Sequence, residues 1–199
     1  MSDLTAEKRA LRRQMRHAVL PADERRRLSE ALCAHVMACD AWRRARRIAA
    51  YVPLPEEADI TPLLREALRT GRLVLPATLR EPQPRMVLRE VRSMEELRPD
   101  AYGIPAPPSE NPEPDPREIG LMLLPLIAAD RCGHRLGKGA GCYDRWIALH
   151  RYTGCRMGIA LPGQVLDRVP AGPLDERLDR LATPDGILIC IHPDDERGA

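Results

Sequence analysis

A single stretch, residues 121–147, constrains the fold of this chain more than any other part of it. It begins with an aliphatic run, residues 121–127, which predicts a buried strand. A polar loop with several glycines follows, and a helix is predicted from Tyr143 onward. In a strand–loop–helix unit, backbone N–H groups and the helix dipole point at one place, where an anion can bind. Because the loop also contains Arg135 and Lys138, we expect the anion to be a phosphate group.

Short aliphatic runs alternate with helical patterns along the rest of the chain. Strands are expected at residues 48–53, 73–77, 86–91, 155–161 and 186–191, and helices at residues 4–19, 21–36 and 62–70. This order predicts an α/β fold with three layers, α/β/α, and a mainly parallel sheet, on which the first two helices pack as a hairpin. Ligands of such sheets bind beyond the carboxyl ends of the strands, where Glu57 and the glycine loop both fall.

The length of 199 residues favours one domain, with a helical segment over residues 1–40 and an α/β body over residues 47–191. A net charge of +2 and an aromatic content of 3% argue against a nucleic-acid binder. Apolar runs are too short for a membrane span, and the N-terminus does not resemble a signal peptide. The six cysteines form no CxxC pair, so we expect free thiols in a cytoplasmic protein.

The glycine loop does not match the two common nucleotide-binding motifs. A Walker A motif needs one more residue between Gly133 and Gly137 and a hydroxyl after Lys138, where Gly139 stands. The spacing of the later glycines does not fit GxGxxG either. Cys132, His134, Cys142 and His150 lack the spacing of zinc ligands, and no base is paired in sequence with Cys142 as a nucleophile.

Asp144 lies just inside the helix that follows the loop. A carboxylate there can be a simple capping group. Beside a phosphate it can instead bind Mg²⁺, which takes one or two carboxylates together with phosphate oxygens. Asp175 and Asp179, in the acidic segment between residues 163 and 185, are the candidates for a second carboxylate ligand.

The loop resembles the signature of a known family. Asp130, Gly133 and the run Arg135-Leu-Gly-Lys-Gly-Ala-Gly-Cys-Tyr-Asp-Arg145 are similar to D-x-x-G-x-R-L-G-x-G-x-G-Y-Y-D-R of the 5-formyltetrahydrofolate cyclo-ligases. Further matches lie in the expected order along the chain: Lys8-x-x-Leu11-Arg12, Tyr51 to Glu57-Ala-Asp59, Leu75-Pro76, Tyr102-Gly-Ile-Pro and Asp175-x-x-x-Asp179. The resemblance covers essentially the whole chain.

The resemblance implies a NagB/RpiA/CoA-transferase-like fold and an enzyme that uses ATP and Mg²⁺ to convert 5-formyltetrahydrofolate into 5,10-methenyltetrahydrofolate. Its partners would be small molecules, ATP and a reduced folate, with no nucleic acid or membrane, and the protein would be a monomer. By the same resemblance Arg135 and Lys138 would be catalytic and Asp144 and Asp179 would bind the metal. The implied ATP-binding residues are Lys8, Arg12, Arg135, Leu136, Gly137, Lys138, Gly139, Ala140, Gly141, Cys142 and Tyr143, and the implied folate-binding residues are Val52, Glu57, Lys138, Gly139, Ala140, Gly141 and Cys142.

The chain departs from the family pattern in places. Cys142 replaces the first Tyr of G-Y-Y-D, and Ala106 replaces a common Glu after G-I-P. The loss of a ring at Cys142 removes a stacking surface and a hydroxyl, so we expect altered folate contact with ATP binding retained. Two alternatives therefore stay open: a paralogue that binds nucleotide or folate without turnover, and an enzyme of the same architecture acting on another formamide or amide.

Overall fold

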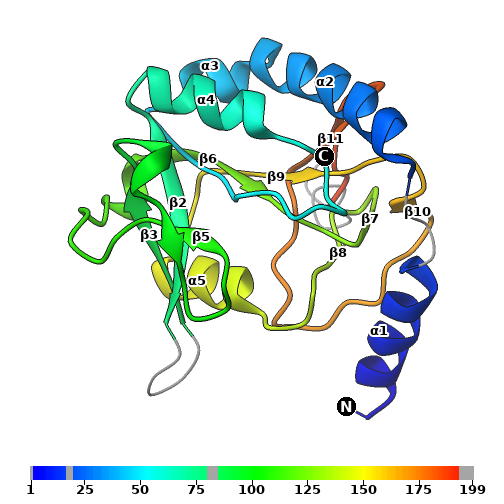
Figure 1. The fold of residues 1–199 in the computed structure, drawn as a ribbon. Helices are drawn as coiled ribbons and strands as arrows, with labels where there is room; N and C mark the ends of the chain where they lie inside the picture. Colours follow the sequence, from blue (N-terminus) through cyan, green and yellow to red (C-terminus); the bar gives the residue numbers. More distant parts are fainter. Residues whose placement is uncertain (1, 17–19, 80–84, 193–199) are drawn as a thin grey trace, which may run out of the picture.

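A seven-stranded sheet with the order β12-β11-β9-β6-β1-β2-β3 forms the centre of the computed structural model, which describes residues 2–16, 20–79 and 85–192 (Figure 1). The middle strands are parallel to one another, whereas the edge strands β3 and β12 are antiparallel to their neighbours. The strands are β1 Arg47–Ala49, β2 Leu73–Leu79, β3 Arg85–Glu90, β6 Ile119–Leu124, β9 Cys155–Ile159, β11 Arg180–Thr183 and β12 Gly186–Ile189. The mainly parallel sheet predicted from the sequence is confirmed.

Helices cover both faces of this sheet (Figure 1). On one face lie α2 Ala22–Ala38, α3 Asp40–Arg44 and α4 Thr61–Arg69, and on the other lies α5 Cys142–His150. Leu32, Trp42 and Leu64 of the helices on the first face pack in a buried cluster with residues of the sheet. Trp146 and Ile147 of α5 pack in a second buried cluster with the sheet on the other face. The three-layer arrangement is therefore confirmed, with α5 in its second outer layer.

The N-terminal helix α1, Ser2–Met15, packs on a different part of the body from α2. Its apolar residues Leu11 and Met15 lie against Ala128, Leu136 and Val169, on the side of a small sheet with the order β10-β7-β8. The expected hairpin of the first two helices is therefore wrong, because the apolar stripe of α1 has another partner. Residues 17–19 of the predicted helix lie outside the described residues.

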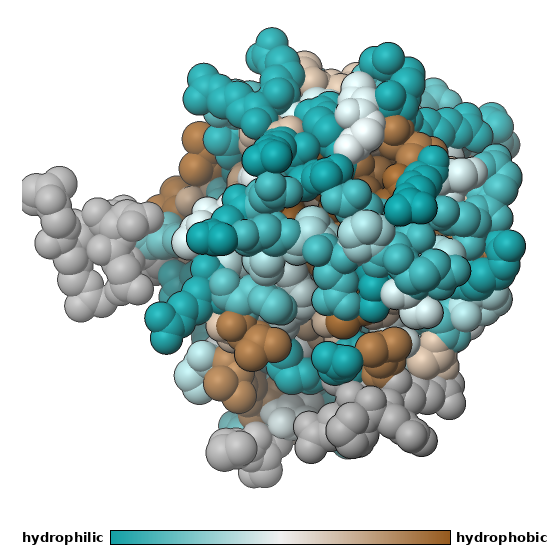
Figure 2. All heavy atoms as spheres, turned by 90° about the vertical axis from the view of Figure 1, so that its left-hand side faces the viewer, coloured by the Kyte–Doolittle hydropathy of each residue, from teal (hydrophilic) through white to brown (hydrophobic). Residues whose placement is uncertain are grey.

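The remaining elements are short. The small sheet comprises β7 Ala128–Asp130, β8 Arg135–Leu136 and β10 Val165–Leu166, and a two-stranded ribbon comprises β4 Arg98–Pro99 and β5 Pro105–Ala106, with 3-10 helices η1 Met94–Glu96 and η2 Pro116–Glu118. The Pro-rich passage between β4 and β6 packs on β2 and β3, where Ala106 is buried with Ala77 and Val87. This side of the molecule is mainly hydrophilic, with hydrophobic residues in small separate groups (Figure 2). No helix in the described part of the chain is both long and apolar enough to cross a membrane.

Candidate functional site

Two loops that leave the carboxyl ends of neighbouring parallel strands, β1 and β6, meet in one place. Lys138 lies beyond β8 in the connection that follows β6. Its Nζ is 2.8 Å from Oε1 of Glu56 and 3.1 Å from Oε1 of Glu57, both in the loop after β1. The chain leaves β1 for β2 on one side and returns to β6 on the other, so this is the switch point of the sheet. The expectation that Glu57 and the glycine loop share one edge is confirmed.

The first half of the glycine loop is held by a buried carboxylate. Asp130 is 2% exposed, and its Oδ1 accepts hydrogen bonds from the backbone N–H groups of Cys132 and His134, each at 3.0 Å. Its Oδ2 accepts from the N–H of Val169 at 2.9 Å and lies 3.0 Å from Nδ1 of His134. The carboxylate therefore fixes the turn and ties it to the segment that follows β10 (Val165–Leu166).

Gly133 closes this turn in a conformation that requires glycine. Its φ is +82°, and a Cβ at this position would overlap the backbone carbonyl oxygen of Leu178. The backbone N–H of Leu178 in turn donates to the carbonyl oxygen of Gly133 at 2.8 Å. The loop is thus packed directly against the backbone that leads into β11.

The second half of the loop is open backbone that leads into α5. Gly139 and Gly141 have φ values of +109° and +62°, and Gly141 is the N-cap of the helix. Gly141 has no side chain with which to cap this helix end, so the first N–H groups of the helix face the loop. The carbonyl oxygen of Ala140 accepts from Nη1 of Arg145 at 2.7 Å. The side chain of Leu136 is buried beneath α1, so only its backbone could contact a ligand in the loop.

Arg135 provides a buried positive charge with an unused donor. Its side chain is 5% exposed, and its Nη2 donates to Oδ1 of Asp144 at 2.7 Å. Its Nη1 is the buried side-chain nitrogen that has no hydrogen-bond partner within the described residues. A buried guanidinium donor without an acceptor costs free energy. A phosphate oxygen at this position would satisfy it, so the residues present fit the phosphate predicted here.

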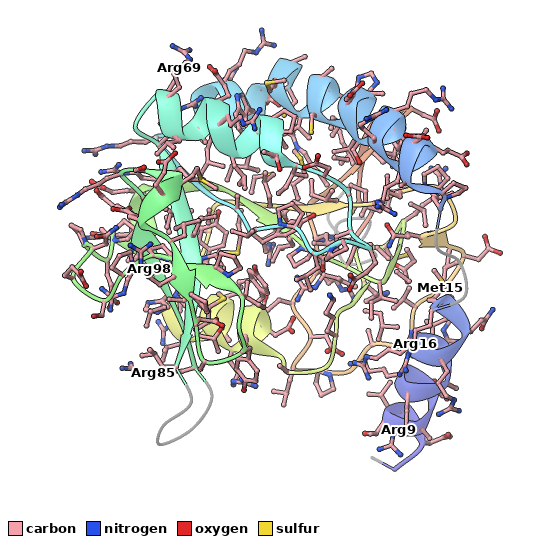
Figure 3. The ribbon with its side chains drawn as sticks, in the orientation of Figure 1. Arg9, Met15, Arg16, Arg69, Arg85 and Arg98 are labelled. Atoms are coloured by element: carbon pink, nitrogen blue, oxygen red, sulfur yellow. The ribbon has the colours of Figure 1, made fainter. Side chains whose placement is uncertain are left out.

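Two cations of α1 point toward the site, Arg12 at the glycine loop and Lys8 at the turn before β11. Nε of Arg12 donates to the carbonyl oxygen of Gly137 at 2.8 Å, and Nζ of Lys8 lies 2.5 Å from Oδ2 of Asp175. Arg9, in the middle of the helix, and Arg16, just beyond its end, are exposed (Figure 3). Lys8 and Arg12 are therefore directed into the body of the protein, whereas Arg9 and Arg16 lie at the surface.

The two proposed metal ligands are each paired with an arginine. Asp144 accepts from Arg135, and also from the backbone N–H of Glu176 at 3.2 Å. Asp179 accepts from Nη2 of Arg156 at 2.7 Å and from Nε at 3.0 Å, and its hydrogen bonds raise the pKa of that guanidinium. No group of three or more metal-ligating side chains occurs among residues 2–16, 20–79 and 85–192. A Mg²⁺ ion here would therefore need phosphate oxygens to complete its shell.

Sequence reasoning did not identify Glu56, Arg156 or Tyr51 as site residues. Tyr51 is 4% exposed, and burial, together with the negative charge of Glu57, raises its pKa well above the usual value for tyrosine. Burial and Glu57 likewise raise the pKa of Tyr143. Tyr51 lies in the carboxyl-terminal half of the strand predicted over residues 48–53, which is a usable signal. Arg156 lies inside β9, and its pairing with Asp179 has no signal in the sequence.

The folate side of the predicted site is formed around the same loop after β1. Glu57 accepts a hydrogen bond from the backbone N–H of Leu54 at 2.9 Å, which orients its carboxylate. Val52 is half-buried against the main core cluster. Cys142 is half-buried in the first turn of α5, with Sγ 3.7 Å from Nη2 of Arg145. Lys138 connects this group to the glycine loop.

Comparison with known proteins gives a consistent result. The model of the 5-formyltetrahydrofolate cyclo-ligase family matches residues 4–184. A 5-formyltetrahydrofolate cyclo-ligase of Mycolicibacterium smegmatis is 30% identical over 152 residues, 73% of this chain and 77% of that protein. The corresponding protein of Escherichia coli is 25% identical over 178 residues, 88% of this chain and 97% of its own length.

Solved structures agree with these relatives. The structure of Aquifex aeolicus 5,10-methenyltetrahydrofolate synthetase superposes with a TM-score of 0.80 at 33% identity and covers 92% of each chain. A synthetase from Mycoplasma pneumoniae, at 23% identity and a TM-score of 0.70, shares the fold. With a family model that spans nearly the whole sequence and a fold common to these enzymes, the chain belongs to the 5-formyltetrahydrofolate cyclo-ligase family of ligases.

Proposed function

We propose that this protein couples hydrolysis of ATP, in the presence of Mg²⁺, to the cyclisation of 5-formyltetrahydrofolate into 5,10-methenyltetrahydrofolate. The observation that carries the proposal is Lys138, which contacts Glu56 and Glu57 while its neighbours lie next to Arg12 and Arg135. One lysine thus adjoins both the loop expected to hold the phosphates and the loop expected to hold the folate. A reaction between the γ-phosphate and the folate needs this adjacency.

The chemistry requires activation of a poor leaving group. The formyl oxygen attacks the γ-phosphorus, the bond to the β-phosphate oxygen breaks, and ADP leaves. N10 then attacks the formyl carbon, the phosphate departs with the former formyl oxygen, and N10 loses its proton. Phosphoryl transfer depends mainly on positioning and on neutralisation of charge. Arg135 and Lys138 suit that task, with Lys8 and Arg12 binding phosphate oxygens.

Each part of the loop receives a role in this proposal. The backbone and cations of residues 135–143, with Lys8 and Arg12, bind ATP; Glu57 and Val52, with residues 138–142, bind the folate. Asp144 and Asp179 would hold Mg²⁺, which supplies charge neutralisation to the phosphates when it is bound. Each carboxylate would then exchange its arginine partner for the ion. The released Arg135 would be free to turn both of its terminal nitrogens to phosphate.

The six cysteines are all free thiols, which supports our further proposal of a reducing compartment such as the cytoplasm. The direct test of function is to follow the absorbance of methenyltetrahydrofolate with 5-formyltetrahydrofolate, ATP and Mg²⁺, and to omit each component in turn. Product that requires all three supports the proposal. Nucleotide binding without product would favour a paralogue that binds nucleotide or folate without turnover. ADP release with a different formamide would favour an enzyme of the same architecture that acts on another substrate.

A further inference from the structure

The turn at residues 172–175, which precedes β11, connects the N-terminal helix α1 to the glycine loop. Oδ2 of Asp175 lies 2.5 Å from Nζ of Lys8, and the same oxygen accepts from the backbone N–H of Gly172 at 2.5 Å. The N–H of Asp175 donates back to the carbonyl oxygen of Gly172 at 3.1 Å. The carboxylate is therefore held by its own turn and presented to Lys8. The two side chains are only 17% and 23% exposed, so the pair is largely withdrawn from solvent screening.

Packing reinforces this contact one helical turn earlier on α1. A Cβ added to Gly172 would lie 2.7 Å from Cδ2 of Leu4, so a larger residue at this position would press on the helix. Leu4 and Lys8 are four residues apart and hence lie on one face of α1. The amino-terminal half of the helix rests on the turn at residues 172–175, and its other half rests on the small sheet through Leu11 and Met15.

The next residue joins the same turn to the metal side of the site. The backbone N–H of Glu176 donates to Oδ1 of Asp144 at 3.2 Å, the oxygen that also accepts from Arg135. The carboxylate of Glu176 lies 3.3 Å from Nη1 of Arg156, which holds Asp179. Two consecutive residues thus contact α1 on one side and the carboxylates of the site on the other.

We propose that Asp175 is a positioning residue for the nucleotide, whose carboxylate holds the Lys8 ammonium and docks α1 against the glycine loop. This inference rests on the proposed function, since it takes Lys8 to be a phosphate ligand. Without Asp175, the amino-terminal half of α1 loses its charged contact with the turn, and the free energy of nucleotide binding must then cover the ordering of Lys8 and of the helix. The folate loop after β1 has no part in this contact.

The test compares Asp175→Asn with the wild-type protein by direct nucleotide binding and by steady-state kinetics. Asparagine keeps the size of the side chain and an oxygen for the N–H of Gly172, but it removes the charge that holds Lys8. We expect the Kd of the nucleotide and the KM for ATP to rise on the order of tenfold, or about 1.4 kcal/mol. The KM for the folate should stay unchanged. Asp167→Asn, an exposed carboxylate on the neighbouring segment, is the matched control and should change none of these.

A double-mutant cycle with Lys8→Met separates positioning from a general loss of structure. If Asp175 acts through Lys8, Asp175→Asn has no further effect on nucleotide affinity in the Lys8→Met protein, and the two losses do not add. Additive losses, or unchanged or tighter binding by Asp175→Asn, would overturn the proposal. If the wild-type protein itself binds no nucleotide, the proposed function fails instead, so the two failures are distinguishable.

Discussion

Replacement of Gly133 by alanine should destabilise the protein through one identifiable backbone contact. A residue with a Cβ pays roughly 1–2 kcal/mol for the left-handed conformation, and φ at Gly133 is +82°. The added methyl group would also overlap the carbonyl oxygen of Leu178, which belongs to the backbone and cannot rotate away. Such overpacking costs about 1–3 kcal/mol, so the total loss in the free energy of unfolding is about 2–5 kcal/mol.

The chain offers a matched control in Gly71, whose φ is +65° but where an added Cβ would have no neighbour within 4 Å. Gly71→Ala should therefore carry the conformational cost alone. Urea denaturation of both variants isolates the steric part, for which we expect a difference of about 2 kcal/mol, or roughly 4–8 °C in Tm for a chain of this size. Equal stability of the two variants would refute the packing of the loop against Leu178.

Three further predictions concern charge and thiols. Asp144→Asn should lower turnover on the order of a hundredfold or more while the far-UV circular dichroism stays unchanged, because the proposed Mg²⁺ ion loses a negatively charged ligand. Near-normal turnover would show that Asp144 is not part of the metal site. The hydrogen bond from Lys138 lowers the pKa of Glu56 below 4.5, so their contact should persist above that pH and be lost only as the pH falls through the lowered value. Carboxyl NMR titration should show a higher pKa of Glu56 in Lys138→Met than in the wild-type protein, and an unchanged titration would contradict the contact. Burial raises the pKa of Cys33 and of Cys190 to about 12. Both thiols should stay unmodified by a thiol reagent at neutral pH until the protein unfolds, and rapid labelling detected by mass spectrometry would argue against that burial.

The sequence predicted those parts of the fold whose cause is local. Aliphatic runs and helix signals located the core strands and α4, and the glycine loop preceded α5 as expected. The position of α1 was not predictable, because its apolar stripe would fit any apolar partner. Strand β11 was also missed inside the segment 163–185: it is only four residues long and depends on partners on both sides, β9 and β12.

Some contacts of the candidate site could be predicted from the sequence, and others could not. That Glu57 and the glycine loop approach each other follows from the rule for parallel sheets, and the contact with Lys138 confirms it. The pairing of Asp179 with Arg156 and of Lys8 with Asp175 joins residues far apart in the chain, and no sequence pattern encodes it. The burial of Arg135 likewise depends on how the loop folds over it.

The central claim is that phosphoryl transfer to the formyl oxygen activates the folate at this site. The most direct measurement follows a formyl oxygen labelled with a heavy isotope through one turnover in the presence of ATP and Mg²⁺. The account predicts that the label appears in the released inorganic phosphate, one atom for each methenyltetrahydrofolate formed. Label found in water, with unlabelled phosphate, would contradict it.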